Sequence, residues 1–252
     1  MHLRRTITNL NWWMIESFRR RPLSLRTMEA TVSFTFDDFP RTAYTNAGAI
    51  LRAYNGRGTY YTAMGLMETT NELGPHFRVQ DLRELVSDGH ELANHTFSHL
   101  SCRGISTDAY VKDVCRDSAA LADFVAATAG GNFSYPFGHI TIGAKKAIGS
   151  RMRSCRGTRG GINGPVADLN ALKANRLYSW CFDLETVQRL ILETQERGGW
   201  LIFYTHDVRD DPSPYGCTPR QFEAVVKHAA ERGIRILTIA ETLADLERRG
   251  AA

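Results

Sequence analysis

TVSFTFDD, residues 31–38, is the stretch around which the rest of the chain can be ordered. Residues 31–36 are rich in alternating β-branched and aromatic side chains, a pattern that predicts a β-strand. Asp37 and Asp38 follow directly, at the expected exit of that strand. Burying a carboxylate costs free energy unless a cation, a donor or a metal ion compensates for it. The sequence should therefore supply partners for this pair.

Short strands and amphipathic helices alternate along the whole chain. Further strands are expected at 58–63, 91–94, 132–135, 152–156, 177–182, 200–205 and 234–239, and helices at 46–54, 79–88, 107–127, 141–149, 184–197, from 218 onward and after 239. Such alternation predicts a parallel sheet with helical crossovers, and about eight repeats indicate a closed or nearly closed barrel. We expect a single-domain α/β fold, a distorted (β/α) TIM-like barrel of seven to eight strands. A doubly wound open sheet is the alternative.

Composition is that of one globular unit with a basic start. The chain has 252 residues, 43% of them hydrophobic, and a net charge of +4. We expect a basic arm at residues 1–30 and the barrel at 31–252. The arm is interpreted as a solvated segment; the alternative, binding to nucleic acid or to an anionic surface, would make this arm the functional part. No GxGxxG or P-loop follows the first strand, which disfavours a nucleotide site there.

The cysteines and the hydropathy of the chain argue against further classes of protein. The five cysteines are odd in number and lack CxxC spacing, which disfavours both a disulfide framework and a thiolate zinc site. The apolar patch at 10–15 is too short for a signal peptide or a membrane span. We expect a soluble cytoplasmic protein without a membrane span.

Polar side chains follow several of the predicted strands. Asp37 and Asp38 follow the first, the HTFSH block at 95–99 follows the third, Tyr135-Pro136 the fourth, and His206-Asp207 the seventh. In a barrel the carboxyl ends of parallel strands meet at one face, where barrel enzymes carry their active sites. We therefore expect these groups to share one site.

The residue types indicate a metal-dependent hydrolase. His95 and His99 are four residues apart, so in a helical turn both imidazoles project from one face. Two imidazoles and one carboxylate with open positions describe a catalytic zinc site, at which bound water becomes more acidic. The second carboxylate can then serve as the base, and His206 can donate a proton to the leaving group.

Four blocks together resemble the polysaccharide deacetylase family, the NodB homology group or carbohydrate esterase family four. They are TFDD at 35–38, HTFSH at 95–99, SYPFG at 134–138 and FYTHD at 203–207. The resemblance implies a distorted (β/α) barrel that hydrolyses N- or O-linked acetyl groups on an acetylated carbohydrate. It also implies Zn2+, with Co2+ or another divalent ion as a substitute.

The resemblance further assigns roles to single residues. Asp37 matches the catalytic base and His206 the general acid, with Asp183 as the aspartate expected to orient it. The metal ligands are Asp38, His95 and His99. Residues expected to contact the substrate are Tyr135, whose backbone N–H would help hold the oxyanion, its neighbour Pro136, Trp180 as an aromatic wall beside the acetyl group, and Tyr204.

Three positions depart from the family pattern. Phe39 stands where the family often has glycine, and Tyr204 where an aliphatic residue lines the acetate pocket. Ser134 replaces an arginine that pairs with the base, a role open to Arg156 or Arg159. Alternatives are therefore a catalytically impaired, metal-bearing carbohydrate binder, a deacylase or amidohydrolase of a small non-glycan substrate, or a two-histidine, one-carboxylate iron oxygenase.

Overall fold

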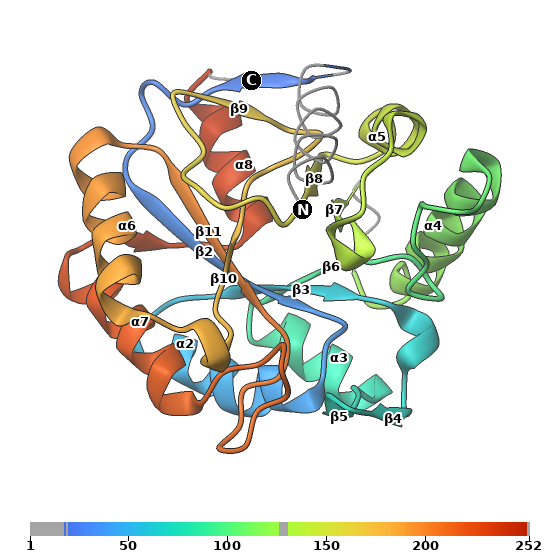
Figure 1. Cartoon of the computed structure of the whole chain (residues 1–252), viewed down its shortest axis with the longest axis horizontal. Helices are drawn as coiled ribbons and strands as arrows, with labels where there is room; N and C mark the ends of the chain where they lie inside the picture. Colours follow the sequence, from blue (N-terminus) through green and yellow to red (C-terminus); the bar gives the residue numbers. More distant parts are fainter. Residues whose placement is uncertain (1–17, 19, 126–130, 251–252) are drawn as a thin grey trace, which may run out of the picture.

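A curled parallel β-sheet forms the centre of the computed structural model, with helices packed around its outside (Figure 1). The structure describes residues 18, 20–125 and 131–250. The main sheet runs in the order β10 (Asn175–Arg176), β11 (Trp200–Thr205), β2 (Thr31–Asp37), β3 (Gly58–Thr62), β6 (Glu91–Asn94), β7 (Asn132–Ser134) and β8 (Ser154–Arg156). All of these neighbours are parallel. The predicted (β/α) barrel is confirmed.

β2 is the central strand. It pairs with β11 along Thr31 to Phe36, and on its other edge first with β12 (Arg235–Ile236) and then with β3. The sheet almost closes on itself, because Leu172 hydrogen-bonds with residues 155 and 157 beside β8 while β10, three residues later, pairs with β11. All residues of β2 and β11 are buried, as expected for parallel strands covered on both faces.

Helices follow most strands and bury their apolar faces against the sheet. They are α2 (Ala49–Ala53), α3 (Val79–Ser87), α4 (Thr107–Leu121), α5 (Ile142–Gly149), α6 (Leu184–Arg197), α7 (Pro219–Glu231) and α8 (Ile239–Arg248), with a π-helix at Ala43–Gly48 and 3₁₀ turns at Met64–Leu66, Pro136–Gly138 and Ser179–Cys181. Thr218 and Thr238 begin α7 and α8 with capping boxes, which satisfy backbone N–H groups that the first turn leaves unpaired.

The alternation of side chains along β2 separates the core from the site. Val32, Phe34 and Phe36 point outward into a cluster with the helices. The odd-numbered residues point into the barrel, where Ser33 accepts a hydrogen bond from Trp200 and Thr35 donates to the carbonyl of Phe203. This period of two residues places Asp37, the last residue of β2, inside the barrel at its carboxyl end.

Several expected boundaries differ from the structure; for example, the helix expected at 107–127 ends at Leu121. Residues 177–182 do not form a strand: the pairing segment is β10, just before them, and 179–181 form a 3₁₀ turn. The expected arm at 1–30 is not all outside the barrel, because β1 (Pro22–Ser24) pairs with β9 (Val166–Asp168) and Leu23, Leu25 and Met28 are buried. Residues 1–17 and 19 lie outside the described part of the chain.

A short hairpin of β4 (Thr70–Asn71) and β5 (Gly74–Pro75) completes the fold. Within residues 18, 20–125 and 131–250, no helix has both the length and the apolar character needed to cross a lipid bilayer. All five cysteines are free thiols.

Candidate active site

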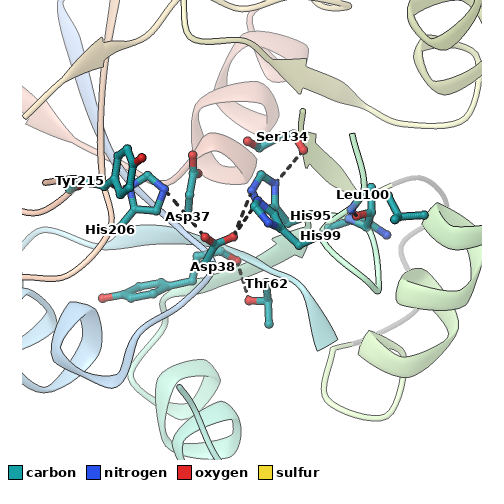
Figure 2. A network of polar contacts seen from close by, with 12 residues as sticks. Asp37, Asp38, Thr62, His95, His99, Leu100, Ser134, His206 and Tyr215 are labelled. Carbon is teal, nitrogen blue, oxygen red and sulfur yellow. Dashed lines mark hydrogen bonds and ion pairs between the residues drawn. The ribbon is translucent and has the colours of Figure 1, made fainter. Parts of the chain in front are cut away.

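Asp38 lies between three imidazoles at the carboxyl end of the sheet (Figure 2). Its Oδ1 is 3.2 Å from Nε2 of His99 and 3.5 Å from Nε2 of His95. Its Oδ2 is 3.9 Å from Nε2 of His206, which comes from the end of β11 on the opposite side. The ligand atoms of Asp38, His95 and His99 all lie within 4.8 Å of one another. The structure thus brings together the residues expected to bind the metal.

The histidine rings are held in orientations that suit metal binding. Nδ1 of His95 lies 2.8 Å from the backbone oxygen of Ser134, so this nitrogen carries the hydrogen and leaves the Nε2 lone pair facing Asp38. Burial lowers the pKa of His95 to about 3 and also lowers that of His99, so both rings are neutral at pH 7. Neutral imidazoles are the form that binds metal ions.

Buried Oδ1 of Asp38 has no hydrogen-bond donor. Burial, together with the charge of the adjacent Asp37, raises the pKa of Asp38 to about 6 even though His206 opposes the shift. An unpaired carboxylate oxygen beside two imidazole lone pairs is costly by itself and becomes favourable when a cation occupies the space. The donor set therefore fits a zinc-like divalent ion with open coordination positions.

Asp37 has a different partner, the buried guanidinium of Arg156. Burial is the largest single influence and acts to raise the pKa of Asp37, but Arg156, through its charge and hydrogen bond, together with His95 and His206, makes the net shift downward. Arg156 is enclosed between the rings of Tyr61 and Tyr204, whose centroids are 5.0 and 4.9 Å from the guanidinium carbon. Asp37 is consequently held ionised at neutral pH.

Arg156 reaches Asp37 because of its place in the sheet. β7 and β8 are paired in register with Ser134 opposite Arg156, and residues opposite each other in neighbouring strands point to the same face. The guanidinium therefore enters the barrel where a long side chain at position 134 would also enter. Of the two arginines expected to pair with the base, Arg156 is the one that does.

The turn after Asp37 has an unusual backbone. Asp38 and Phe39 have φ values of 62° and 56°, in the left-handed region that favours glycine. Phe39 compensates for this strain through its fully buried ring, which lies 5.1 Å from that of Phe77 and 5.0 Å from that of Tyr60. The departure from glycine at 39 is thus accommodated without loss of the turn.

His206 is positioned by the loop that follows it. Its Nδ1 lies 3.1 Å from the carbonyl oxygen of Tyr215, so Nδ1 carries the hydrogen and Nε2 faces the site. The next residue, Asp207, is fully buried and accepts hydrogen bonds from the backbone amide and hydroxyl of Ser213, at 2.8 and 2.5 Å. These bonds hold loop 207–217 against the end of β11.

Asp183 does not contact His206, contrary to expectation. Its exposed carboxylate caps α6 by accepting hydrogen bonds from the amide and hydroxyl of Thr186. An aspartate directly before a helix commonly serves this purpose. The carbonyl of Tyr215 takes the orienting position instead.

The expected role of the Tyr135 backbone N–H also needs correction. The backbone N–H of Tyr135 donates to the carbonyl of Arg156 at 3.1 Å, within the sheet, and so is not free to hold an oxyanion. Trp180 is 67% exposed and lies at the rim, whereas the rings of Tyr178 and Tyr215 stand beside His206. Tyr204 packs on Arg156, as described above.

Buried Pro136 begins the 3₁₀ turn that places the ring of Phe137 4.4 Å from that of His99.

Asp117, a residue that sequence reasoning missed, accepts hydrogen bonds from the backbone amides of Met64 and His95 and so fixes the start of the histidine block. Its place on the inner stripe of the predicted helix 107–127 was the one available signal, because a buried carboxylate there needs donors.

The sequence profile described as polysaccharide deacetylase matches residues 25–168, more than half of the chain. The chain belongs to the polysaccharide deacetylase family. No curated protein matches it.

Solved structures of polysaccharide deacetylase relatives share the fold. A family 4 acetyl xylan esterase from Clostridium thermocellum, in complex with a cobalt ion, is 20% identical with a TM-score of 0.58, over 88% of this chain and 93% of that one. PdaA of Bacillus subtilis, a family 4 carbohydrate esterase, is 12% identical with a TM-score of 0.58, over 92% and 87%. Bc1960, a peptidoglycan N-acetylglucosamine deacetylase, is 14% identical with a TM-score of 0.57, over 88% and 90%.

Proposed function

We propose that this member of the polysaccharide deacetylase family is a metal-dependent hydrolase that removes acetyl groups from a carbohydrate. The observation that carries the proposal is the buried, donor-free oxygen of Asp38 beside the Nε2 atoms of His95 and His99, next to a second carboxylate with a separate partner. The acetyl xylan esterase of similar fold was solved with a cobalt ion, which supports a divalent metal here.

The two aspartates have different tasks in this proposal. Asp38, His95 and His99 hold a zinc or similar divalent ion, which when bound polarises the acetyl carbonyl and acidifies water. Asp37, ionised through Arg156, accepts a proton from the water that adds to the carbonyl carbon. The ion pair with Arg156 also fixes the orientation of the Asp37 carboxylate.

In this proposal His206 is the proton donor to the leaving group. Its Nε2 faces the site from the side opposite the two ligand histidines, and the Tyr215 carbonyl fixes its ring. When the bond between the carbonyl carbon and the sugar nitrogen or oxygen breaks, protonated His206 donates a proton to that atom and acetate is released. The side chains of His206 and His99 are 14% and 21% exposed, which leaves the site accessible to a sugar.

The alternative of an impaired carbohydrate binder derives from Ser134 and from Phe39, whose turn is kept as described above. Arg156 supplies the charge that Ser134 lacks, so this departure gives no reason to favour loss of activity. The small-substrate deacylase, the iron oxygenase and a cytoplasmic location stay untested predictions. The strand–helix fold disfavours the oxygenase, because such sites usually lie in an all-β jelly roll.

The test is acetate release with and without a chelator, over chitooligosaccharides, peptidoglycan fragments and O-acetylated polysaccharides, together with elemental analysis of the purified protein. We expect chelator-sensitive acetate release and a divalent metal at one equivalent per chain. Asp38→Ala should lose both, whereas Asp211→Ala, a change at an exposed aspartate in loop 207–217, should lose neither. Full activity of Asp38→Ala, or glycan binding without acetate release, would refute the proposal.

A further inference from the structure

Exposed aromatic side chains flank the active site on both sides. Phe137, 60% exposed, lies against His99, while Tyr215, 48% exposed, has its ring 5.6 Å from that of His206. Trp180, 67% exposed, lies farther out on the His206 side. Large aromatic faces left in water at a site commonly mark where a ligand binds. Their positions imply a ligand that extends across the site beyond one acetyl group.

Trp180 is fixed next to the residue that orients His206. Its indole Nε1 donates to the carbonyl of Pro214 at 2.9 Å, and the following residue, Tyr215, holds His206 through its own carbonyl. One edge of the indole is thereby tied to loop 207–217, while most of the side chain faces solvent. A rigid, exposed ring at this place can stack on the sugar next to the one that is deacetylated.

Arg176 stands beside that ring. It ends β10, is exposed, and its guanidinium carbon lies 6.0 Å from the centroid of Trp180. Among the described residues, no carboxylate forms an ion pair with Arg176, although many of the chain's other arginines have one. A free guanidinium presents a planar set of donors that matches a carboxylate better than a neutral hydroxyl group.

Both residues line one cavity of about 470 Å³. Its volume is in the range of small-ligand sites. Its other polar lining includes Thr158, whose hydroxyl can bond a sugar hydroxyl, and also Asn175, whose carboxamide bonds Gly161 and Ile202, and Asp183. The carboxylate of Asp183 is already occupied by the amide and hydroxyl of Thr186 at the start of α6, so it does not pair with Arg176.

We propose that this cavity is a subsite for a sugar that carries a carboxylate, with Trp180 under the sugar ring and Arg176 on the carboxylate. The proposal rests on the proposed function and deepens it, since it names an acidic glycan as the substrate class. A neutral glycan would use the same ring but would leave Arg176 without a partner.

The test compares two hexasaccharides of equal length and linkage. One alternates N-acetylglucosamine with glucuronic acid; in the other the carboxyl groups have been reduced to hydroxymethyl groups. Affinity is measured by calorimetry on the full chain in chelator, where hydrolysis cannot interfere, and kcat and KM are measured on the zinc-loaded protein. We expect at least tenfold tighter binding of the acidic hexasaccharide, seen as a lower KM at similar kcat.

Variants separate the two parts of the subsite. Arg176→Gln should abolish the preference for the acidic glycan, with an unchanged unfolding temperature because the side chain is exposed. Trp180→Ala should weaken binding of both glycans. Arg83→Gln, at an exposed arginine on α3, is the matched control and should leave both affinities unchanged.

Equal affinity for the two hexasaccharides, or a preference that survives Arg176→Gln, would overturn the subsite. The proposed function is judged separately, by chelator-sensitive release of acetate from a small acetyl ester. Acetate release without glycan preference refutes the subsite alone. Preference for the acidic glycan without acetate release from any substrate supports the subsite and refutes the hydrolase.

Discussion

Replacing Arg156 with methionine tests whether the guanidinium keeps the buried Asp37 carboxylate ionised and stabilises the fold. Arg156 is fully buried, and the carboxylate it binds is only 5% exposed. Methionine fills a similar volume between the two tyrosine rings but leaves the carboxylate without its cation. Breaking a buried ion pair from one side costs about 3–5 kcal/mol, a large part of a typical stability of about 5–15 kcal/mol.

The pH dependence of this loss has a definite sign. In the native protein the pKa of Asp37 is below its usual value, so the pair stabilises the fold above pH 3.8 and the contribution fades as pH falls further. In Arg156→Met, burial without the cation raises that pKa, so the variant is destabilised as pH rises and Asp37 must ionise. The difference in stability between the two proteins should therefore be largest at neutral pH and shrink toward pH 4.

Urea unfolding in chelator, followed by circular dichroism at pH 7 and pH 4, measures both effects. The second variant is Arg156→Met combined with Asp37→Asn, which removes both charges and should recover at least about 2 kcal/mol of the loss, since an unpaired buried charge is what makes the single change costly. A loss below about 1 kcal/mol in Arg156→Met would contradict the reasoning. So would a double variant whose loss equals the sum of the two single losses.

Three further outcomes are expected. Asp38→Ala should weaken zinc binding by more than about 100-fold in equilibrium dialysis, since losing even an outer partner of a ligand costs about 10- to 100-fold; unchanged affinity would place the metal elsewhere. His206→Ala should lower kcat by about 10²- to 10⁴-fold with full zinc content, as for loss of a proton donor, and a drop below threefold would remove His206 from the mechanism. Buried His90 accepts a hydrogen bond from the backbone N–H of Gly58, and burial lowers its pKa to about 4. Because the unfolded chain binds this proton already near pH 6.5, His90 should remove about 3 kcal/mol of stability between pH 7 and pH 4. His90→Asn, which keeps an acceptor but does not titrate, should unfold with a correspondingly flatter pH dependence, and an unchanged slope would show that other groups cause it.

The location of the site could be predicted from sequence because it depends on a general property of parallel sheets. Carboxyl ends of parallel strands meet at one face, so Asp38, His95 and His206 could be grouped without knowing any distance. The strand at 31–36 and the helix at 184–197 were also predicted with nearly the observed bounds. The strong alternation of side chains in the strand and the capping residue before the helix determine these bounds.

Pairing across strands could not be predicted, because it depends on register. The sequence left Arg156 and Arg159 as equal candidates, and only the pairing of Ser134 with Arg156 selects between them. Asp183 was assigned to His206 on similarity of position, although its place directly before a helix already indicated a cap. Trp180 was expected beside the acetyl group because of the family resemblance, whereas it lies in a 3₁₀ turn and its side chain is exposed.

The register between Ser134 and Arg156 bears on how such enzymes diverge. A long cationic side chain can be lost from one strand and regained on its neighbour while the guanidinium still arrives at the same carboxylate. Two successive substitutions on adjacent strands would be enough. If the arginine at position 156 is gained before the arginine at position 134 is lost, the carboxylate is never without a cation and no inactive intermediate arises. Homologues could then be misclassified if they were judged active or inactive only by whether an arginine precedes the Tyr-Pro block. An arginine on the neighbouring strand would keep some of those without it active.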